Sequence, residues 1–202
     1  MMVSLQKKIA FLSMPKCAST SIEKALMPYS QIIFTGNPKI KHMNYRGYVK
    51  KVEPIIISAG VNDVTTFCLF REPLEWLQSW YRYRARKALA DPKAPRHRNY
   101  TGDVSFQEFV LAYINNHDVS WNKVGRQSRF VSDKEGRVAV DKVFRLDKQK
   151  PLYDFLQERI GMNLEIPQKN ISPHELDYTL DDSVKREAMD FLSEEYEIYE
   201  TL

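Results

Sequence analysis

Residues 9–22 read IAFLSMPKCASTSI, and this stretch decides the expected fold. The apolar run Ile9–Leu12 predicts a buried strand, and Ile22 lies in a stretch with helical periodicity. Between them lies a polar turn that holds one lysine and the hydroxyl groups of Ser19, Thr20 and Ser21. A helix N-terminus presents unpaired N–H groups and favours negative charge, so strand, turn and helix together predict an anion-binding loop.

Lys16 would add a full positive charge to this loop. In a simpler alternative, Ser19 or Thr20 only caps the helix and Lys16 is solvated, and the local sequence leaves both interpretations open. The loop lacks the G-x-x-x-x-G-K-[ST] pattern of nucleotide-hydrolysing P-loops, because no glycine lies between Ser13 and Ile22. The pattern therefore disfavours a Walker-type kinase or GTPase but still permits a phosphate-like ligand.

Length and composition indicate one globular domain covering residues 1–202, with 43% hydrophobic and 28% charged residues. No apolar run approaches the roughly 20 residues of a membrane span, and the run after the first lysines is too short for a signal peptide. We therefore expect a cytoplasmic protein. The two cysteines make neither a disulfide framework nor a zinc site. Cys68 is expected in the core, whereas Cys17 is either a small loop residue or a reactive thiol.

Positive charge is concentrated in one segment of a chain whose net charge is +4. Residues 82–98 contain seven Lys or Arg and one Asp, whereas residues 171–202 contain ten acids and two bases. A basic patch can bind nucleic acid, but the sequence contains no nucleic-acid-binding motif. A polyanionic or phosphorylated small ligand fits this distribution better.

A histidine follows the second predicted strand, residues 31–34, and its turn at residues 35–38. If that strand runs parallel to the first, His42 falls at the same carboxyl edge as Lys16, where ligands of open α/β sheets collect. The alternative is a solvated loop histidine, and the residues alone leave both open.

A third predicted strand, Thr65–Phe70, ends at Arg71, and Pro73 then opens a helix with Ser79 about two turns in. Alternating strands and helices indicate an α/β domain with a mainly parallel sheet. The remaining expectations are a short helix over 44–52, a strand or buried loop over 54–60, a long loop over 90–102, a helix with a capping box at Ser105–Glu108, a strand over 142–146, a helix over 152–160 and a last helix from Asp181 or Asp182.

Two motifs together resemble the sulfotransferases that use 3′-phosphoadenosine-5′-phosphosulfate (PAPS), above all the carbohydrate sulfotransferase branch and its bacterial relatives. Residues Met14–Ser21 are similar to the family's 5′-phosphosulfate loop. Phe70–Pro73 with Ser79 resembles the 3′-phosphate motif, R-x-P followed by a serine eight residues after the arginine. Lys41 and His42 resemble the family's basic catalytic position. Weaker matches lie at residues 105–109, 144–146 and 168–172 and around Tyr196 and Tyr199.

The resemblance implies a three-layer, P-loop-like α/β fold that transfers a sulfuryl group from PAPS to an acceptor hydroxyl. The acceptor would be a carbohydrate, PAP would be the product, and neither a metal nor nucleic acid would be required. His42 would act as general base and Lys16 would stabilise the leaving oxygen. The residues that it assigns to PAPS are Pro15, Lys16, Cys17, Ala18, Ser19, Thr20, Ser21, Arg71 and Ser79.

The chain departs from the family pattern at two places. Cys17, Ala18 and Ser19 stand where the family often has Thr-Gly-Gly, which is expected to restrict backbone approach to the sulfate. Glu72 places an acid next to Arg71. The rival readings are a nucleotide or small-molecule kinase, a non-catalytic nucleotide-binding protein and, third, a nucleic-acid binder. Glu53 and His97 are reserve candidates for the base.

Overall fold

The computed structural model describes residues 1–161 and 176–202, so the weak sequence match at residues 168–172 lies outside the described residues. By its internal contacts the chain divides into two compact units. The first comprises Met1–Arg71, Gln127–Ile171 and Leu202, and the second comprises Glu72–Arg126 and Ser172–Thr201. The loop after the first predicted strand, His42 and Arg71 all belong to the first unit.

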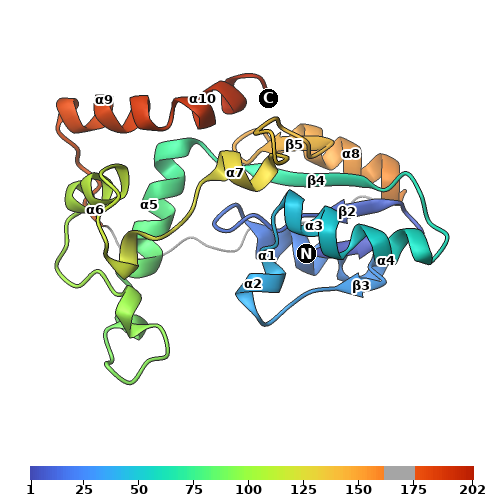
Figure 1. Ribbon diagram of the computed structural model, residues 1–202, viewed down its shortest axis with the longest axis horizontal. Helices are drawn as coiled ribbons and strands as arrows, with labels where there is room; N and C mark the ends of the chain where they lie inside the picture. Colours follow the sequence, from blue (N-terminus) through green and yellow to red (C-terminus); the bar gives the residue numbers. More distant parts are fainter. Residues whose placement is uncertain (162–175) are drawn as a thin grey trace. The chain divides into compact units, whose positions relative to one another are not determined.

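The first unit is an α/β layer structure (Figure 1). Its strands are β1 (Met2–Ser4), β2 (Ile9–Phe11), β3 (Ile32–Ile33), β4 (Thr65–Phe70) and β5 (Lys142–Arg145). Its helices are α1 (Ser19–Leu26), α2 (Pro38–Lys41), α3 (Tyr45–Lys51), α4 (Glu53–Ser58), α7 (Gln127–Val131) and α8 (Lys150–Ile160), with a 3-10 turn at Met27–Tyr29.

The five strands form one sheet in the order β3-β1-β2-β4-β5. β2 pairs in parallel with β4, and β4 pairs in parallel with β5, whereas β1 is antiparallel to both of its neighbours. Because β2 and β3 are both antiparallel to β1, they run in the same direction. The predicted mainly parallel sheet is confirmed, and the carboxyl ends of β2, β3 and β4 meet at one edge.

Helices cover both faces of this sheet. On one face Phe67 of β4 packs against Phe11, Phe144 and Phe155, with ring centroids 5.1, 6.4 and 5.2 Å away, so α8 lies there. Thr66 points to the opposite face, because side chains alternate along a strand. Figure 1 draws α3 and α4 in front of the sheet and α8 behind it. The fold is therefore a three-layer, P-loop-like α/β architecture, as the family resemblance implied.

Two elements of the first unit differ from the sequence-based predictions. Residues 54–60 were expected to form a strand or a buried loop, but Glu53–Ser58 is helix α4, with Pro54 in its first turn. Ile55 and Ile57 are 54% and 55% exposed, so the isoleucine run that resembled a buried segment is only partly buried. The short strand β1 was not predicted.

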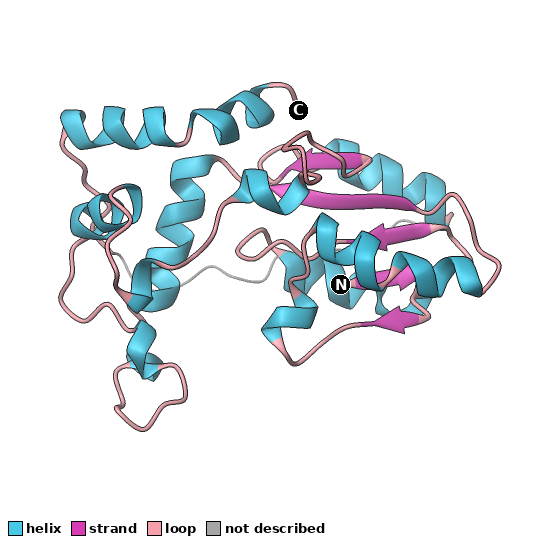
Figure 2. Ribbon diagram, viewed as in Figure 1, coloured by secondary structure: helices cyan, strands magenta, loops and turns pink. Residues whose placement is uncertain are grey.

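The second unit, as far as it is described, is built of helices and loops (Figure 2). Its helices are α5 (Pro73–Arg84), α6 (Phe106–Ile114), α9 (Asp182–Phe191) and α10 (Ser193–Glu200), with 3-10 turns at Lys87–Leu89, His97–Asn99 and Ser120–Asn122. The predicted capping box before α6 is confirmed, because the Ser105 hydroxyl accepts from the Glu108 N–H and the Glu108 carboxylate accepts from the Ser105 N–H. Within the two described stretches, no helix has the length and apolar character needed to cross a bilayer.

Candidate functional site

The loop between β2 and α1 holds two residues in the left-handed backbone region. Lys16 has φ of 67° and Ala18 has φ of 51°, whereas Cys17 between them has a negative φ. Alternation of this kind turns successive N–H groups toward one side, which is the geometry of anion-binding backbone nests. Each non-glycine residue in this region costs roughly 1–2 kcal/mol, so the loop keeps a strained conformation that the rest of the unit must stabilise.

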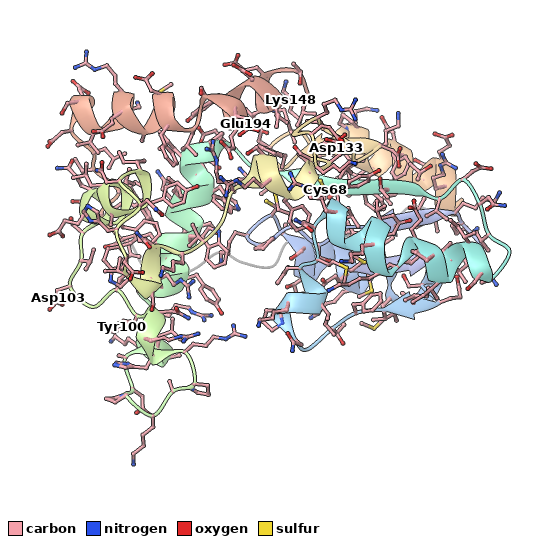
Figure 3. The ribbon with its side chains drawn as sticks, in the orientation of Figure 1. Cys68, Tyr100, Asp103, Asp133, Lys148 and Glu194 are labelled. Atoms are coloured by element: carbon pink, nitrogen blue, oxygen red, sulfur yellow. The ribbon has the colours of Figure 1, made fainter. Side chains whose placement is uncertain are left out.

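Cys17 anchors the loop from the inside. Its side chain is buried, and its thiol donates a hydrogen bond to Gln127 Oε1 at 3.4 Å. Burial raises the pKa of the Cys17 thiol to about 12, although the positive charges of Arg71 and Lys16 oppose this shift. The thiol is therefore protonated at neutral pH, so the alternative of a reactive cysteine is wrong. Cys68 is buried in β4, as predicted (Figure 3).

The N-terminus of α1 has no side-chain cap. The N-cap residue is Ala18, and no side chain accepts a hydrogen bond there, so the alternative in which Ser19 or Thr20 caps the helix is wrong. The Ser13 and Ser21 hydroxyl oxygens are buried without a hydrogen-bond partner. A buried hydroxyl left unpaired costs about 1–3 kcal/mol, and such groups beside a helix N-terminus fit a loop whose polar contacts a ligand completes.

The ends of β2 and β4 bring two cations to one place. Lys16 follows β2, Arg71 follows β4, and both charges act on the Cys17 thiol. The neighbouring strand β5 also ends in an arginine, but Arg145 forms a two-point pair with Asp147, with N–O distances of 3.0 and 2.7 Å. Lys16 and Arg71 are therefore the two cations at this sheet edge whose charges act on the loop residue Cys17.

His42 lies beside the same loop. It follows α2, and its Nδ1 is 2.6 Å from the Ser13 carbonyl oxygen. A carbonyl only accepts, so Nδ1 carries the proton and Nε2 keeps its lone pair. Burial lowers the pKa of His42, although the Ser13 hydrogen bond opposes the shift. His42 is thus a neutral, oriented imidazole rather than a solvated loop residue, and it lies at the edge that the parallel strand direction predicted.

A buried carboxylate supports the position of His42. Glu23 of α1 is 4% exposed, and its Oε2 lies 3.0 Å from Nζ of Lys41, the residue before His42. This pair links α1, which begins at the anion loop, to the end of α2. The sequence analysis did not single out Glu23, since its partner lies 18 residues away and no motif marks it.

Ser79 belongs to the second unit, where it is buried in α5. Glu72 belongs to the same unit and caps α5: its Oε2 accepts from the Glu75 N–H at 2.6 Å, and its Oε1 accepts from the Tyr196 hydroxyl. The carboxylate of Glu72 is therefore occupied within its own unit. The reserve base His97 also lies there, with Nδ1 2.9 Å from the Leu89 carbonyl, whereas the other reserve candidate, Glu53, is the first residue of α4.

A parallel sheet edge with an uncapped helix N-terminus, two cations and a neutral imidazole is suited to hold an anionic group next to a residue that can accept a proton. The profile of the sulfotransferase family matches residues 1–200. The chain therefore belongs to the sulfotransferase family. Comparison with curated proteins and with solved structures gave no match.

Proposed function

We propose that this sulfotransferase takes its sulfuryl group from PAPS and transfers it to a hydroxyl of an acidic carbohydrate. One observation carries the proposal: the 2.6 Å hydrogen bond that holds His42, with Nε2 unprotonated, against the carbonyl of Ser13 at the start of the anion loop. Family membership over residues 1–200 supports it, and we further propose that the two units work together as one domain.

The residues of the first unit fit a donor with anionic groups at both ends. The uncapped N-terminus of α1 and the loop N–H groups suit the 5′ phosphosulfate. Arg71 suits the 3′-phosphate, since a guanidinium can form two parallel charge-assisted hydrogen bonds to it. The family resemblance adds Ser79, Pro15 and the hydroxyls of residues 19–21.

PAPS supplies an activated sulfuryl group. In the proposed reaction, His42 Nε2 accepts the proton of the acceptor hydroxyl while its oxygen forms the new S–O bond. The S–O bond to the 5′-phosphate breaks, and its electron pair remains on the phosphate oxygen, where Lys16 stabilises the charge. The products are PAP and a sulfate ester. A general base contributes about 10²–10⁴-fold and a positioned cation about 10²–10³-fold.

Aromatic rings and arginines of the second unit support an acidic acceptor. The Arg84 guanidinium lies 5.2 Å from the Trp80 ring centroid, and that of Arg86 lies 3.7 Å from the Tyr83 ring centroid. Arg96 donates to the Tyr83 hydroxyl at 3.0 Å. Burial alone would raise the pKa of Tyr83, but the charges of Arg86 and Arg96 outweigh it and lower the pKa. We call these five residues the arginine–aromatic cluster.

Residues 82–98, which include the three arginines of this cluster, carry a surplus of positive charge. Within residues 1–161 and 176–202, none of the seven Lys and Arg side chains of residues 82–98 forms a salt bridge. Arg84 is 7% exposed, whereas Arg86 and Arg96 are exposed, so these two arginines can offer donors to a ligand. Arginines that stack on aromatic faces and retain donors suit a sugar ring bearing a carboxylate or a sulfate.

Calorimetric titration with PAP, ATP and GTP, each with and without Mg²⁺, separates this proposal from its rivals. We expect PAP to bind equally well in EDTA and in Mg²⁺, and more tightly than either triphosphate. Mg²⁺-dependent binding of ATP with weak binding of PAP would instead support the kinase. Tight PAP binding without any transfer activity would support the non-catalytic binding protein.

A further inference from the structure

Gln127 is a buried amide that touches both anion-binding segments of the first unit. It is the first residue of α7 and is 1% exposed. Its carboxamide hydrogen bonds to Arg71, 56 residues earlier in the chain, and to Cys17, 110 residues earlier. No sequence motif marks this residue, and the family resemblance gives it no role.

Both polar atoms of the Gln127 side-chain amide form hydrogen bonds: Oε1 accepts two and Nε2 donates one. Oε1 accepts from the Arg71 N–H at 3.0 Å and from the Cys17 thiol at 3.4 Å. Nε2 donates to the Arg71 carbonyl at 2.9 Å. Because the Arg71 N–H needs an acceptor and its carbonyl needs a donor, this network also fixes which way the amide faces. Gln127 therefore holds both backbone polar groups of Arg71, as a neighbouring strand would.

We infer that Gln127 is a positioning residue for the donor nucleotide. It sets the distance between the loop that carries Lys16 and the strand end that carries Arg71. A ligand with anionic groups at both ends gains from two sites only when their spacing is fixed in advance, because a flexible spacing adds an entropic cost to binding. The inference rests on the proposed function, since it assumes a ligand with phosphates at both ends. Gln127 itself touches neither phosphate in this scheme.

The chemistry of the site explains why glutamine serves here. A carboxylate of the same shape would accept from Arg71 N–H and from Cys17, but its second oxygen would face the Arg71 carbonyl. An aliphatic side chain would leave the Arg71 N–H and carbonyl buried and unpaired, at a cost of about 1–3 kcal/mol each. Burial keeps Cys17 a protonated donor, so the contact between Cys17 and Gln127 persists across neutral pH.

The test compares a ligand that spans both sites with ligands that occupy one. Calorimetry would measure the Kd of PAP, of adenosine 5′-phosphate and of adenosine 3′-phosphate for the wild type and for Gln127→Met. We expect the PAP Kd to rise about tenfold or more in the variant, while the two monophosphates change less than about threefold. A merely structural role would weaken all three ligands alike, and that result would overturn the inference.

Two further variants keep the test decisive if Gln127→Met does not fold. Gln127→Glu should bind PAP weakly at pH 8 and recover relative to the wild type toward pH 5, as the carboxyl takes up a proton and can donate to Arg71. Cys17→Ala, which removes the thiol that donates to Gln127 Oε1, should lose part of the PAP affinity. Unchanged PAP affinity in these variants, with the wild type binding PAP, would overturn the inference alone. A wild type that does not bind PAP would overturn the proposed function and this inference with it.

Discussion

The two units handle positive charge in opposite ways. In the first, Lys16 and Arg71 stand at the ends of parallel strands, and the backbone around them is held by buried groups such as Gln127 and Cys17. In the second, the cations of residues 82–98 lie on and beyond the end of α5, and several stack on aromatic rings. In the first unit, hydrogen bonds fix the backbone that carries a few charges. In the second unit, many charged side chains lie on and after the end of one helix.

This difference suggests a division of labour. Fixed geometry suits a reacting group, because orientation lowers the barrier only when it exists before the reaction. An excess of side-chain charge suits a large and variable acceptor, because it attracts an anion without demanding one orientation. Substitutions in the first unit should therefore change turnover or donor affinity, and those in the second should change the KM of the acceptor.

The largest effect is expected at His42. His42→Ala should lower kcat by about 10²–10⁴-fold, because it removes the base, and should leave the PAP Kd within about twofold. Steady-state kinetics and calorimetry on one preparation measure both quantities. Full turnover in the variant would refute His42 as the base and make Glu53 and His97 the next residues to test.

The pH profile tests the same residue in the wild type. The pKa of His42 is lowered from its usual 6.5 by burial, so the base should be active throughout neutral pH, and kcat should fall only below that value. The native state binds fewer protons than the unfolded state there, so stability should also fall as the pH drops below about 6.5. Both trends should weaken in His42→Gln, and an acid limb above pH 7 would contradict the buried imidazole.

Arg71 should have the next largest effect, on the donor. Arg71→Ala should raise the PAP Kd by about 10–100-fold, because hydrogen bonds to charged groups contribute about 1.5–3 kcal/mol. Adenosine 5′-phosphosulfate, which lacks the 3′-phosphate, should bind the variant and the wild type alike. Arg145→Ala is the matched control, since Arg145 ends the next strand but is already paired with Asp147. Equal losses for both nucleotides would place Arg71 elsewhere than at the 3′-phosphate.

A smaller effect is expected in the arginine–aromatic cluster. The double variant Arg86→Ala with Arg96→Ala should raise the KM of an acidic glycan by about three- to tenfold, since each exposed ion pair contributes about 0.2–1 kcal/mol. The KM of a neutral glycan and the PAP Kd should stay unchanged, and the effect should shrink at high salt. Lys50→Ala removes an exposed cation of α3 as a control. Equal effects on acidic and neutral glycans would contradict the division of labour.

The smallest effect concerns stability and the strained loop. Ala18→Gly should raise the free energy of unfolding by about 0.5 kcal/mol, because glycine adopts a φ of 51° without a Cβ clash, which outweighs its greater unfolded-state entropy. Urea denaturation measures the change. Ala112→Gly, inside helix α6, should lower stability by about 1 kcal/mol or more. Destabilisation by Ala18→Gly would show that the loop is not strained at this residue.

The sequence predicted those parts of the fold that depend on local patterns. The apolar runs before Ser13 and Arg71 are strands, and the serine and glutamate of the capping box start α6 as expected. Residues 54–60 were misassigned because three adjacent isoleucines resemble a buried run, although two of them face solvent. Strand β1 was missed because Ser4 ends its apolar run after Val3, whereas the run Ile9–Leu12 that marks β2 is uninterrupted.

The site was predictable only where neighbours in sequence are neighbours in space. Lys16 and the helix that follows it form one short motif, so the loop could be recognised. The expected parallel direction of the strand before His42 was enough to predict that His42 lies at the same sheet edge. The positive φ values of Lys16 and Ala18 could not be expected, since glycine is the residue that usually signals them. Gln127 lies far in sequence from both of its partners, so only the folded chain reveals its role.

The most direct test of the account is transfer of radiolabelled sulfuryl from PAPS into a panel of acidic glycans, neutral glycans, phenols and lipids, with His42→Ala in parallel. We predict labelled acidic glycan with the wild type, none above background with the variant, and equal PAP affinity for the two proteins. Label transferred equally by His42→Ala, or no acceptor labelled by a wild type that binds PAP, would contradict it.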